Sequence, residues 1–76
     1  MNIEERRHIL GKRIRSVREL QGISQRSFAL MTGISQPYLS GVERGEISVG
    51  FNNLCKIADG LGVELTDLVS LEHTQA

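Results

Sequence analysis

Twenty residues near the middle of the chain, from Gln25 to Arg44, constrain its fold more than any other segment. A small residue, Ala29, lies where two helices would have to touch, and Gly33 lies in the turn that would separate them. Three apolar anchors follow that turn: Ile34, Leu39 and Val42. This pattern is typical of two short helices that are joined by a tight turn and bury one side each. The segment therefore predicts a helix-turn-helix.

Capping residues mark the ends of these two helices. Ser24 is a favoured N-cap for the first helix, and Gly33 can end it because glycine accepts a positive φ. The second helix is expected to start around Ser35 and Gln36, with Pro37 in its first turn, where the missing N–H is harmless. Because the residue before a proline is pushed out of the helical region, Gln36 is itself a candidate for the cap.

The flanking segments predict three further helices. Asn2 and Glu5 have the spacing of a capping box, so we expect a first helix to begin at Asn2 and to stop at Gly22. Gly11 within this helix either admits another helix at close range or marks the true start of the ordered core. An amphipathic stripe indicates a helix between residues 50 and 62: Phe51, Leu54, Ile57, Ala58 and Leu61. A short fifth helix carries three apolar residues: Leu65, Leu68 and Val69.

Five helices without a strand pattern predict an all-α bundle. We expect one domain over residues 1–76, with its core at about residues 10–70 and the helix-turn-helix at residues 25–44. Only 4% of the residues are aromatic, so the core must be aliphatic. No apolar run approaches the roughly 18 residues of a membrane span, and the first residues lack a signal peptide. We therefore expect a cytoplasmic protein with no membrane partner.

The side chains that commonly bind metals do not cluster in the sequence. Cys55 is the only cysteine, so no internal disulfide can form. It is either a redox thiol or a small residue partly buried on a helix. His8 and His73 lie near opposite ends of the chain, without cysteines at ligand spacing. We expect no metal and no cofactor, and the lack of a catalytic triad or a carboxylate pair argues against an enzyme.

Charge is unevenly distributed although the formal net charge is zero. Residues 1–38 carry seven basic and three acidic side chains, and residues 39–76 carry two basic and six acidic ones, so the halves have charges of +4 and −4. A basic face toward a polyanion and an acidic face away from it would give this asymmetry. An ordinary solvated first helix would also give it, so charge alone leaves both interpretations open.

Several short motifs surround the predicted turn: Gly22-Ile23-Ser24-Gln25, Gly33-Ile34-Ser35-Gln36 and Val42-Glu43-Arg44-Gly45. With these motifs, the stretch from Ile14 to Val69 resembles the Cro/CI-type helix-turn-helix family, also called XRE. The resemblance implies a five-helix bundle of the phage-repressor type that binds double-stranded operator DNA, commonly as a dimer, and usually represses transcription. Small members of the family serve as phage-type repressors, restriction–modification controllers and antitoxins, and the sequence does not choose among these roles.

Base contacts are expected on the helix that begins near Gln36. The Gln36 amide can bond adenine N6 and N7 together, and Ser40 lies one turn further along the same face. Ser35 is expected at the same interface. Tyr38 is a candidate for contact with a phosphate or a thymine methyl group, and its alternative is packing against the loop that follows.

Phosphate contacts are expected from both ends of the motif. The resemblance implies that Gln25, at a helix N-terminus, bonds a phosphate and braces Gln36. Arg26 and Arg44 are long cations that can reach phosphates, although Arg26 could equally be a solvated surface residue. Phosphate contacts fix the register of a protein on DNA, whereas base contacts specify the sequence.

Two positions on the second helix depart from the family pattern. Many members carry polar or charged side chains at the positions of Pro37 and Gly41, neither of which can hydrogen-bond a base. We expect Pro37 to pack on a thymine methyl group and Gly41 to let its helix approach the bases closely. DNA shape would then carry more of the specificity.

The resemblance also implies an ion pair, and the small size of one module implies a dimer. The family pairs Arg18 with Glu43 as a partly buried ion pair between the first and third helices. One module buries too little DNA surface for tight specific binding, so we expect a homodimer that reads two half-sites. Its interface would use C-terminal apolar residues, whose alternative is burial against the first helix: Val63, Leu65, Leu68, Val69 and Leu71.

A protein-interaction role is the alternative to DNA reading. The same fold could serve as an adaptor or antitoxin-like partner that binds a toxin or a polymerase, and the neutral net charge and the bare Gly41 favour this hypothesis. A DNA-binding chain could likewise be controlled by a regulatory protein partner. The salt dependence of DNA binding separates the two hypotheses, because phosphate contacts release counterions.

Overall fold

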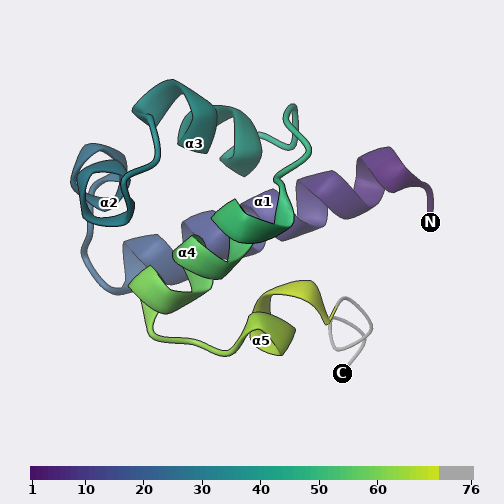
Figure 1. Ribbon diagram of the computed structural model, residues 1–76. Coiled ribbons are helices and arrows are strands. Elements are labelled where there is room, and N and C mark those ends of the chain that lie inside the picture. Colours follow the sequence, from purple (N-terminus) through teal and green to yellow (C-terminus); the bar gives the residue numbers. More distant parts are fainter. Residues whose placement is uncertain (71–76) are drawn as a thin grey trace.

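A computed structural model describes residues 1–70 and contains five helices in that range. They are α1 (Ile3–Leu20), α2 (Gln25–Thr32), α3 (Gln36–Glu43), α4 (Phe51–Leu61) and α5 (Leu65–Val69). In Figure 1, α1 runs along the molecule, α2 and α3 lie above it, α4 crosses in front of it and α5 lies below. The prediction of an all-α five-helix bundle is confirmed for the described residues. None of these helices has both the length and the apolar character that crossing a membrane requires.

The first helix begins where its capping residues predict. The Asn2 side chain accepts a hydrogen bond from the Glu5 backbone N–H at 2.8 Å, and the Glu5 carboxylate accepts one from the Asn2 N–H at 2.9 Å. This reciprocal pair is a capping box. Because α1 is continuous from Ile3, Gly11 does not mark the start of the ordered core.

Serine side chains cap both helices of the motif. Ser24 Oγ accepts a hydrogen bond from the Ser27 N–H, and Ser35 Oγ accepts one from the Tyr38 N–H at 3.3 Å. Gly33 ends α2 with a φ of 73°, as the sequence predicts. Gln36 is not the cap of α3. It is the first helical residue, because Ser35 takes the extended conformation of an N-cap.

The core is aliphatic around a single fully buried phenylalanine. Residues from all five helices meet there with no exposed surface: Ile14, Phe28, Leu39, Ile57 and Leu68. The burial of Leu68 corrects the expectation that it belongs to a dimer interface. Val63 and Leu65 are half-buried against the core, and Val69 is the one well-exposed member, at 41%, among the four that fall within residues 1–70. Leu71 lies outside the described residues.

Two side chains, one in α1 and one at its C-cap, donate hydrogen bonds to backbone carbonyls at the ends of other helices. Arg13 Nη1 donates to the carbonyl oxygens of Leu68 and Ser70 at 3.0 and 3.1 Å. Gln21 Nε2 donates to Leu61 O at 2.7 Å. Carbonyls at a helix C-terminus lack partners within the helix, so these bonds fix the ends of α4 and α5 against α1.

Candidate nucleic-acid interface

The outer side of α3 is polar and uncovered. Gln36 and Pro37 are exposed, Ser40 follows one turn later, and Arg44 caps the C-terminal end. The opposite side is buried in the core through Leu39 and Val42. In Figure 1 no other labelled helix lies over α3 on its outward side. The arrangement presents an amide and a hydroxyl group on a helix narrow enough for the major groove of DNA.

An ion pair fastens the inner side of α3 to α1. Arg18 Nε and Nη2 donate to the two carboxylate oxygens of Glu43 at 2.7 and 2.8 Å. The side chains are only 7% and 3% exposed. Arg18 Nη1 also donates to Ile23 O at 2.8 Å, so the guanidinium holds the turn before α2 as well. The hydrogen bond to Glu43 raises the pKa of Arg18 above its usual value, against the opposing effect of burial.

Gln25 joins this buried pair. Its Nε2 donates to Glu43 Oε1 at 3.1 Å, so the first residue of α2 is hydrogen-bonded to the last residue of α3. The partner of the Gln25 amide nitrogen in this structure is Glu43, and the expected brace between Gln25 and Gln36 stays a prediction. Its neighbour Arg26 is exposed at the start of α2, where the free N–H groups and the positive end of the helix dipole favour an anion.

A second, exposed polar cluster lies at the C-terminal end of α3. Arg44 donates to Ser40 Oγ through Nη1 and to Glu46 Oε1 through Nη2, the latter at 3.0 Å. Arg44 and Glu46 are 54% and 62% exposed. The hydrogen bond from Arg44 lowers the pKa of Glu46. Sequence reasoning missed Glu46, although its place two residues after a candidate phosphate ligand was a usable signal.

Gly41 does not face the open side of α3. It is buried, and a Cβ added there would lie 2.3 Å from Ile47 Cδ1 and 2.7 Å from Ile47 Cγ1. The expectation that Gly41 lets the helix approach DNA is corrected, because this glycine makes room for the loop after α3. Tyr38 also contacts that loop, since its hydroxyl oxygen accepts a hydrogen bond from the Gly50 N–H at 3.2 Å. The packing alternative for Tyr38 is the one present in the structure.

The basic residues of α1 are mostly engaged within the protein. Arg13 binds carbonyls near α5, Arg15 pairs with Glu19 on the same helix at 3.1 Å, and Arg18 binds Glu43. These contacts favour the interpretation of α1 as an ordinary charged helix over that of a face for a polyanion. Within residues 1–70, no three His, Cys, Asp or Glu side chains lie close enough together to hold a metal ion.

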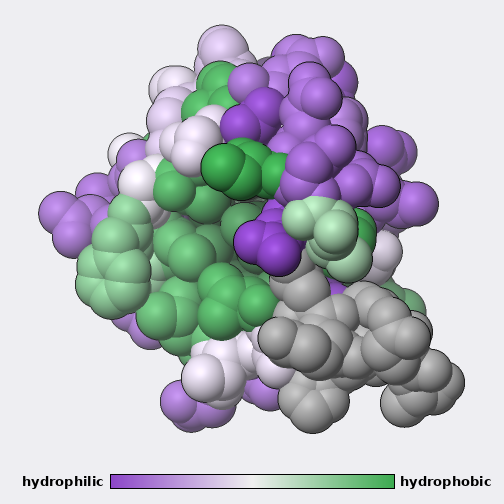
Figure 2. All heavy atoms as spheres, turned by 90° about the vertical axis from the view of Figure 1, so that its right-hand side faces the viewer, coloured by the Kyte–Doolittle hydropathy of each residue, from purple (hydrophilic) through white to green (hydrophobic). Residues whose placement is uncertain are grey.

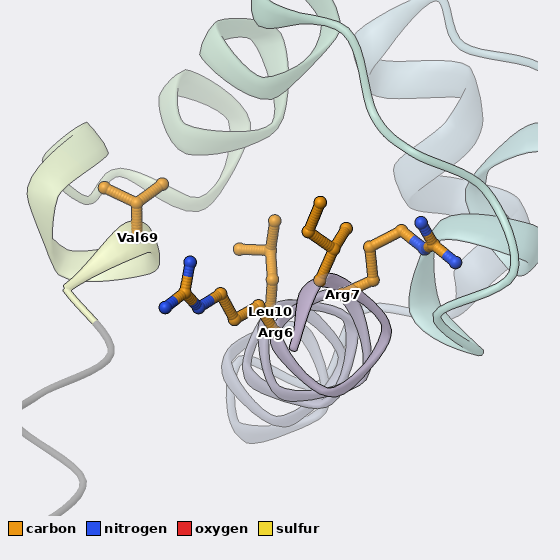
Figure 3. A pocket seen from close by; sticks show the side chains of 5 residues that line it. Arg6, Arg7, Leu10 and Val69 are labelled. Atoms are coloured by element: carbon orange, nitrogen blue, oxygen red, sulfur yellow. The ribbon is translucent and has the colours of Figure 1, made fainter. Parts of the chain in front are cut away.

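An apolar groove lies on a different side of the molecule, between the start of α1 and α5. Ile3, Leu10 and Val69 supply its apolar lining, and Arg6 and Arg7 complete the lining. In Figure 3, Arg6 points from α1 toward Val69, whereas Arg7 points to the opposite side. Figure 2 shows this end of the molecule as a broad apolar area with hydrophilic side chains along its border.

Comparisons with known proteins agree on one family. The chain matches the family HTH_3, described as helix-turn-helix, over residues 14–68. It is 38% identical over 61 residues to the control protein C.MunI of Mycoplasma sp., covering 79% of this chain and 82% of that protein. The regulator PuuR of Escherichia coli is 32% identical over 60 residues, which are 79% of this chain but only 32% of PuuR.

A solved structure supports the same relationship. The restriction-modification controller protein C.AhdI of Aeromonas hydrophila superimposes with a TM-score of 0.80 at 35% sequence identity. The match covers 82% of this chain and 94% of C.AhdI. The helix arrangement described above is therefore that of a family of known regulators.

Proposed function

On the premise that this chain belongs to the helix-turn-helix family HTH_3 of DNA-binding transcriptional regulators, we propose that it is a repressor that reads a two-fold operator as a homodimer. The α3 helix enters the major groove, where the Gln36 amide bonds an adenine and Ser40 contacts a neighbouring base edge or phosphate. Gln25, Arg26 and Arg44 bind phosphates on either side.

One observation carries this proposal: the outer side of α3 is open while its inner side is fixed. Arg18 and Glu43 hold the helix from within, and Gln36 is exposed on the outside. A reading helix must present its polar groups in a fixed geometry, because base contacts depend on position to about half an ångström. A buried ion pair is weak evidence for stability but suits a role in orientation.

The similarity to controller proteins supports a narrower role. C.MunI is described as a control protein and C.AhdI as a restriction-modification controller, and both match over most of their length. We propose that this chain has the same kind of role, rather than that of an antitoxin. The adaptor alternative depended on the neutral net charge and on the missing side chain at Gly41. The second argument no longer favours it, because a side chain at position 41 would overlap Ile47 whether or not α3 binds DNA.

The proposed dimer uses the groove at the start of α1. Of the C-terminal residues expected at the interface, Val63, Leu65 and Leu68 are turned inward. The exposed apolar side chains that line the groove are Ile3 at 70% and Val69 at 41%. A second copy would match this groove through its own exposed apolar residues and through opposite charges. Arg6 lines it on α1, and α5 carries Asp67, so a two-fold arrangement can place the partner's acidic helix near the basic one.

Selection of bound sequences from a random pool of DNA duplexes tests DNA reading and symmetry together. We expect enriched sequences to contain two inverted half-sites about 34–36 Å apart, which is one helical turn. The Gln36→Ala variant, selected in parallel, should lose the preference at one position of each half-site. A pool without enrichment, or enrichment that Gln36→Ala leaves unchanged, would contradict the proposed reading by α3.

Sedimentation equilibrium at tens of micromolar tests the dimer. We expect the wild-type chain to sediment as a dimer and Ile3→Lys to sediment as a monomer. Leu30→Lys is the matched control, because Leu30 is exposed to a similar extent, at 77% against 70% for Ile3, but lies on α2. A monomeric wild type, or an Ile3→Lys variant that stays dimeric, would contradict the proposed interface.

A further inference from the structure

The first half of α1 contacts the end of α3, although it lies outside the stretch that matches the family. The family match begins at residue 14, and the contact is centred on Gly11. This glycine is buried, and a Cβ added to it would lie 2.4 Å from Val42 O and 2.6 Å from Glu43 O. Both are backbone atoms, so no side-chain rotation could relieve the overlap.

Gly11 and Arg18 fix the last turn of α3 at two points on one face of α1. The buried residues of α1 are Gly11, Ile14 and Arg18, at a spacing that places them along a single stripe. Arg18 holds the Glu43 side chain, and the bare Cα of Gly11 receives the backbone of the same residue. The distance between the two helices is therefore set by the absence of a side chain at position 11.

Two residues nearer the N-terminus hold the loop that follows. Arg7 Nε donates to Gly45 O at 3.3 Å. His8 lies against Gly45 so closely that a Cβ at position 45 would be 2.5 Å from His8 Nδ1. Figure 3 shows Arg7 leaving α1 toward the side of the α3–α4 connection, away from α5.

We propose that Arg7, His8 and Gly11 are positioning residues for DNA reading, which together form a brace that sets the angle of α3 against the duplex. The inference rests on the proposed function, in which α3 reads bases. An eight-residue helix is only about 12 Å long, so a tilt imposed at Val42 and Glu43 is transmitted to Gln36 at the other end. The base contacts would then lose their alignment while the fold is kept.

The test compares Gly11→Ala with Ser16→Ala. Both variants place an alanine on α1, but Ser16 is exposed, so its change alters helix propensity without adding a group against α3. The measurement is the ratio of operator affinity to affinity for random duplex DNA, at a temperature where circular dichroism shows both variants folded. We expect Gly11→Ala to lower this ratio on the order of tenfold, the size of one lost base contact, and Ser16→Ala to leave it unchanged.

Backbone amide shifts give a readout that does not depend on DNA. In ¹H–¹⁵N spectra we expect Gly11→Ala to move the signals of Gln36–Glu43, and Ser16→Ala to leave them in place. A folded Gly11→Ala variant with an unchanged affinity ratio and unmoved α3 signals would overturn the brace. If wild type shows no operator preference while the α3 signals still move, the proposed function fails, and the brace stands only as a contact that sets the position of α3 against α1.

A second variant covers the case in which Gly11→Ala does not fold. Arg7→Met keeps a side chain of similar length but removes every N–H donor that could reach Gly45 O, and it adds no atoms against the backbone. We expect the affinity ratio to fall by about twofold to threefold. We also expect the backbone amide signals of α3 to move. A ratio equal to that of wild type would overturn the brace.

Discussion

Gln25 and Arg18 bind the same carboxylate oxygen, Glu43 Oε1, at 3.1 and 2.8 Å. One buried side chain therefore connects α1, the start of α2 and the end of α3. The residue proposed to bind a phosphate at the N-terminus of α2 is thereby connected to the far end of the reading helix. The residues proposed for phosphate binding and for base reading therefore belong to one hydrogen-bonded frame.

Removal of the shared carboxylate is expected to destabilise the protein more than it alters sequence preference. Glu43→Ala leaves the Arg18 guanidinium buried without its partner, which typically costs about 3–5 kcal/mol. Urea unfolding followed by circular dichroism measures this loss. Glu46→Ala is the control, because its exposed ion pair with Arg44 contributes little. Equal unfolding midpoints for wild type and Glu43→Ala would contradict the proposed role of the pair.

Gln36→Ala is expected to relax specificity without changing stability. The side chain is exposed, so its removal leaves the core intact. A bidentate contact between an amide and adenine contributes about 1–3 kcal/mol of discrimination against the other bases. Competition binding with operators changed at one position measures the loss, which should be confined to a single base pair in each half-site. Uniform weakening at all positions would indicate that Gln36 contacts the backbone instead.

Arg26→Gln is expected to weaken binding to all DNA sequences about equally. Arg26 is an exposed cation beside the N-terminus of α2, and its proposed partner is a phosphate. The slope of log K against log salt concentration should become shallower by about 0.9 for each lost phosphate contact in a protomer. Arg15→Gln on α1 is the matched control and should leave the slope unchanged. An unchanged slope for Arg26→Gln would indicate that Arg26 is a solvated surface residue that contacts no phosphate.

Local sequence signals predicted the helices and their ends well. The capping residues bind partners only a few positions away, so a short stretch of sequence is enough to predict them: Asn2 with Glu5, Ser24 and Gly33. Contacts between distant segments were not predictable in this way. The pairing of Gly41 with Ile47 depends on how the loop after α3 folds back.

Within the candidate site, the exposure of side chains could be predicted from the sequence, whereas the hydrogen bonds between helices could not. The exposure of Gln36 follows from the pattern of apolar residues around it, whereas the direction of the Gln25 amide depends on three helices meeting at Glu43. Leu68 was misassigned because an apolar residue in a short terminal helix can face either the core or a partner. Only the packing of α5 on α1 and α4 decides which, and here it buries Leu68 completely.

Gly41→Ala is expected to destabilise the protein, and a smaller residue at position 47 is expected to restore stability. The added methyl group would overlap Ile47 Cδ1 and Cγ1, and overpacking of this kind costs about 1–3 kcal/mol. Alanine also favours the helix by up to about 1 kcal/mol over glycine, which offsets part of the cost. Thermal melts of Gly41→Ala, Ile47→Ala and the double variant measure the coupling. Additive effects of the two changes would contradict direct contact.

Glu46→Gln is expected to strengthen DNA binding, because Glu46 competes with phosphate for Arg44. The Arg44 hydrogen bond lowers the pKa of Glu46, so the pair is fully formed above the ordinary pKa of a glutamate and is lost as the pH falls through the lowered value. Near neutral pH the carboxylate is therefore charged and holds the guanidinium. Glutamine removes that charge, and the salt dependence of DNA binding should steepen by about one phosphate contact.

NMR titration of the Glu46 carboxyl carbon checks the cause of this effect. In wild type its pKa should lie below that of an ordinary glutamate, and Arg44→Met should raise it toward the ordinary value, because Arg44 supplies the stabilising hydrogen bond. Arg44→Met should also abolish the gain in affinity that Glu46→Gln produces, since no guanidinium remains to be released. A gain that persists in the double variant would mean that Glu46 acts by simple repulsion of the DNA and not through Arg44.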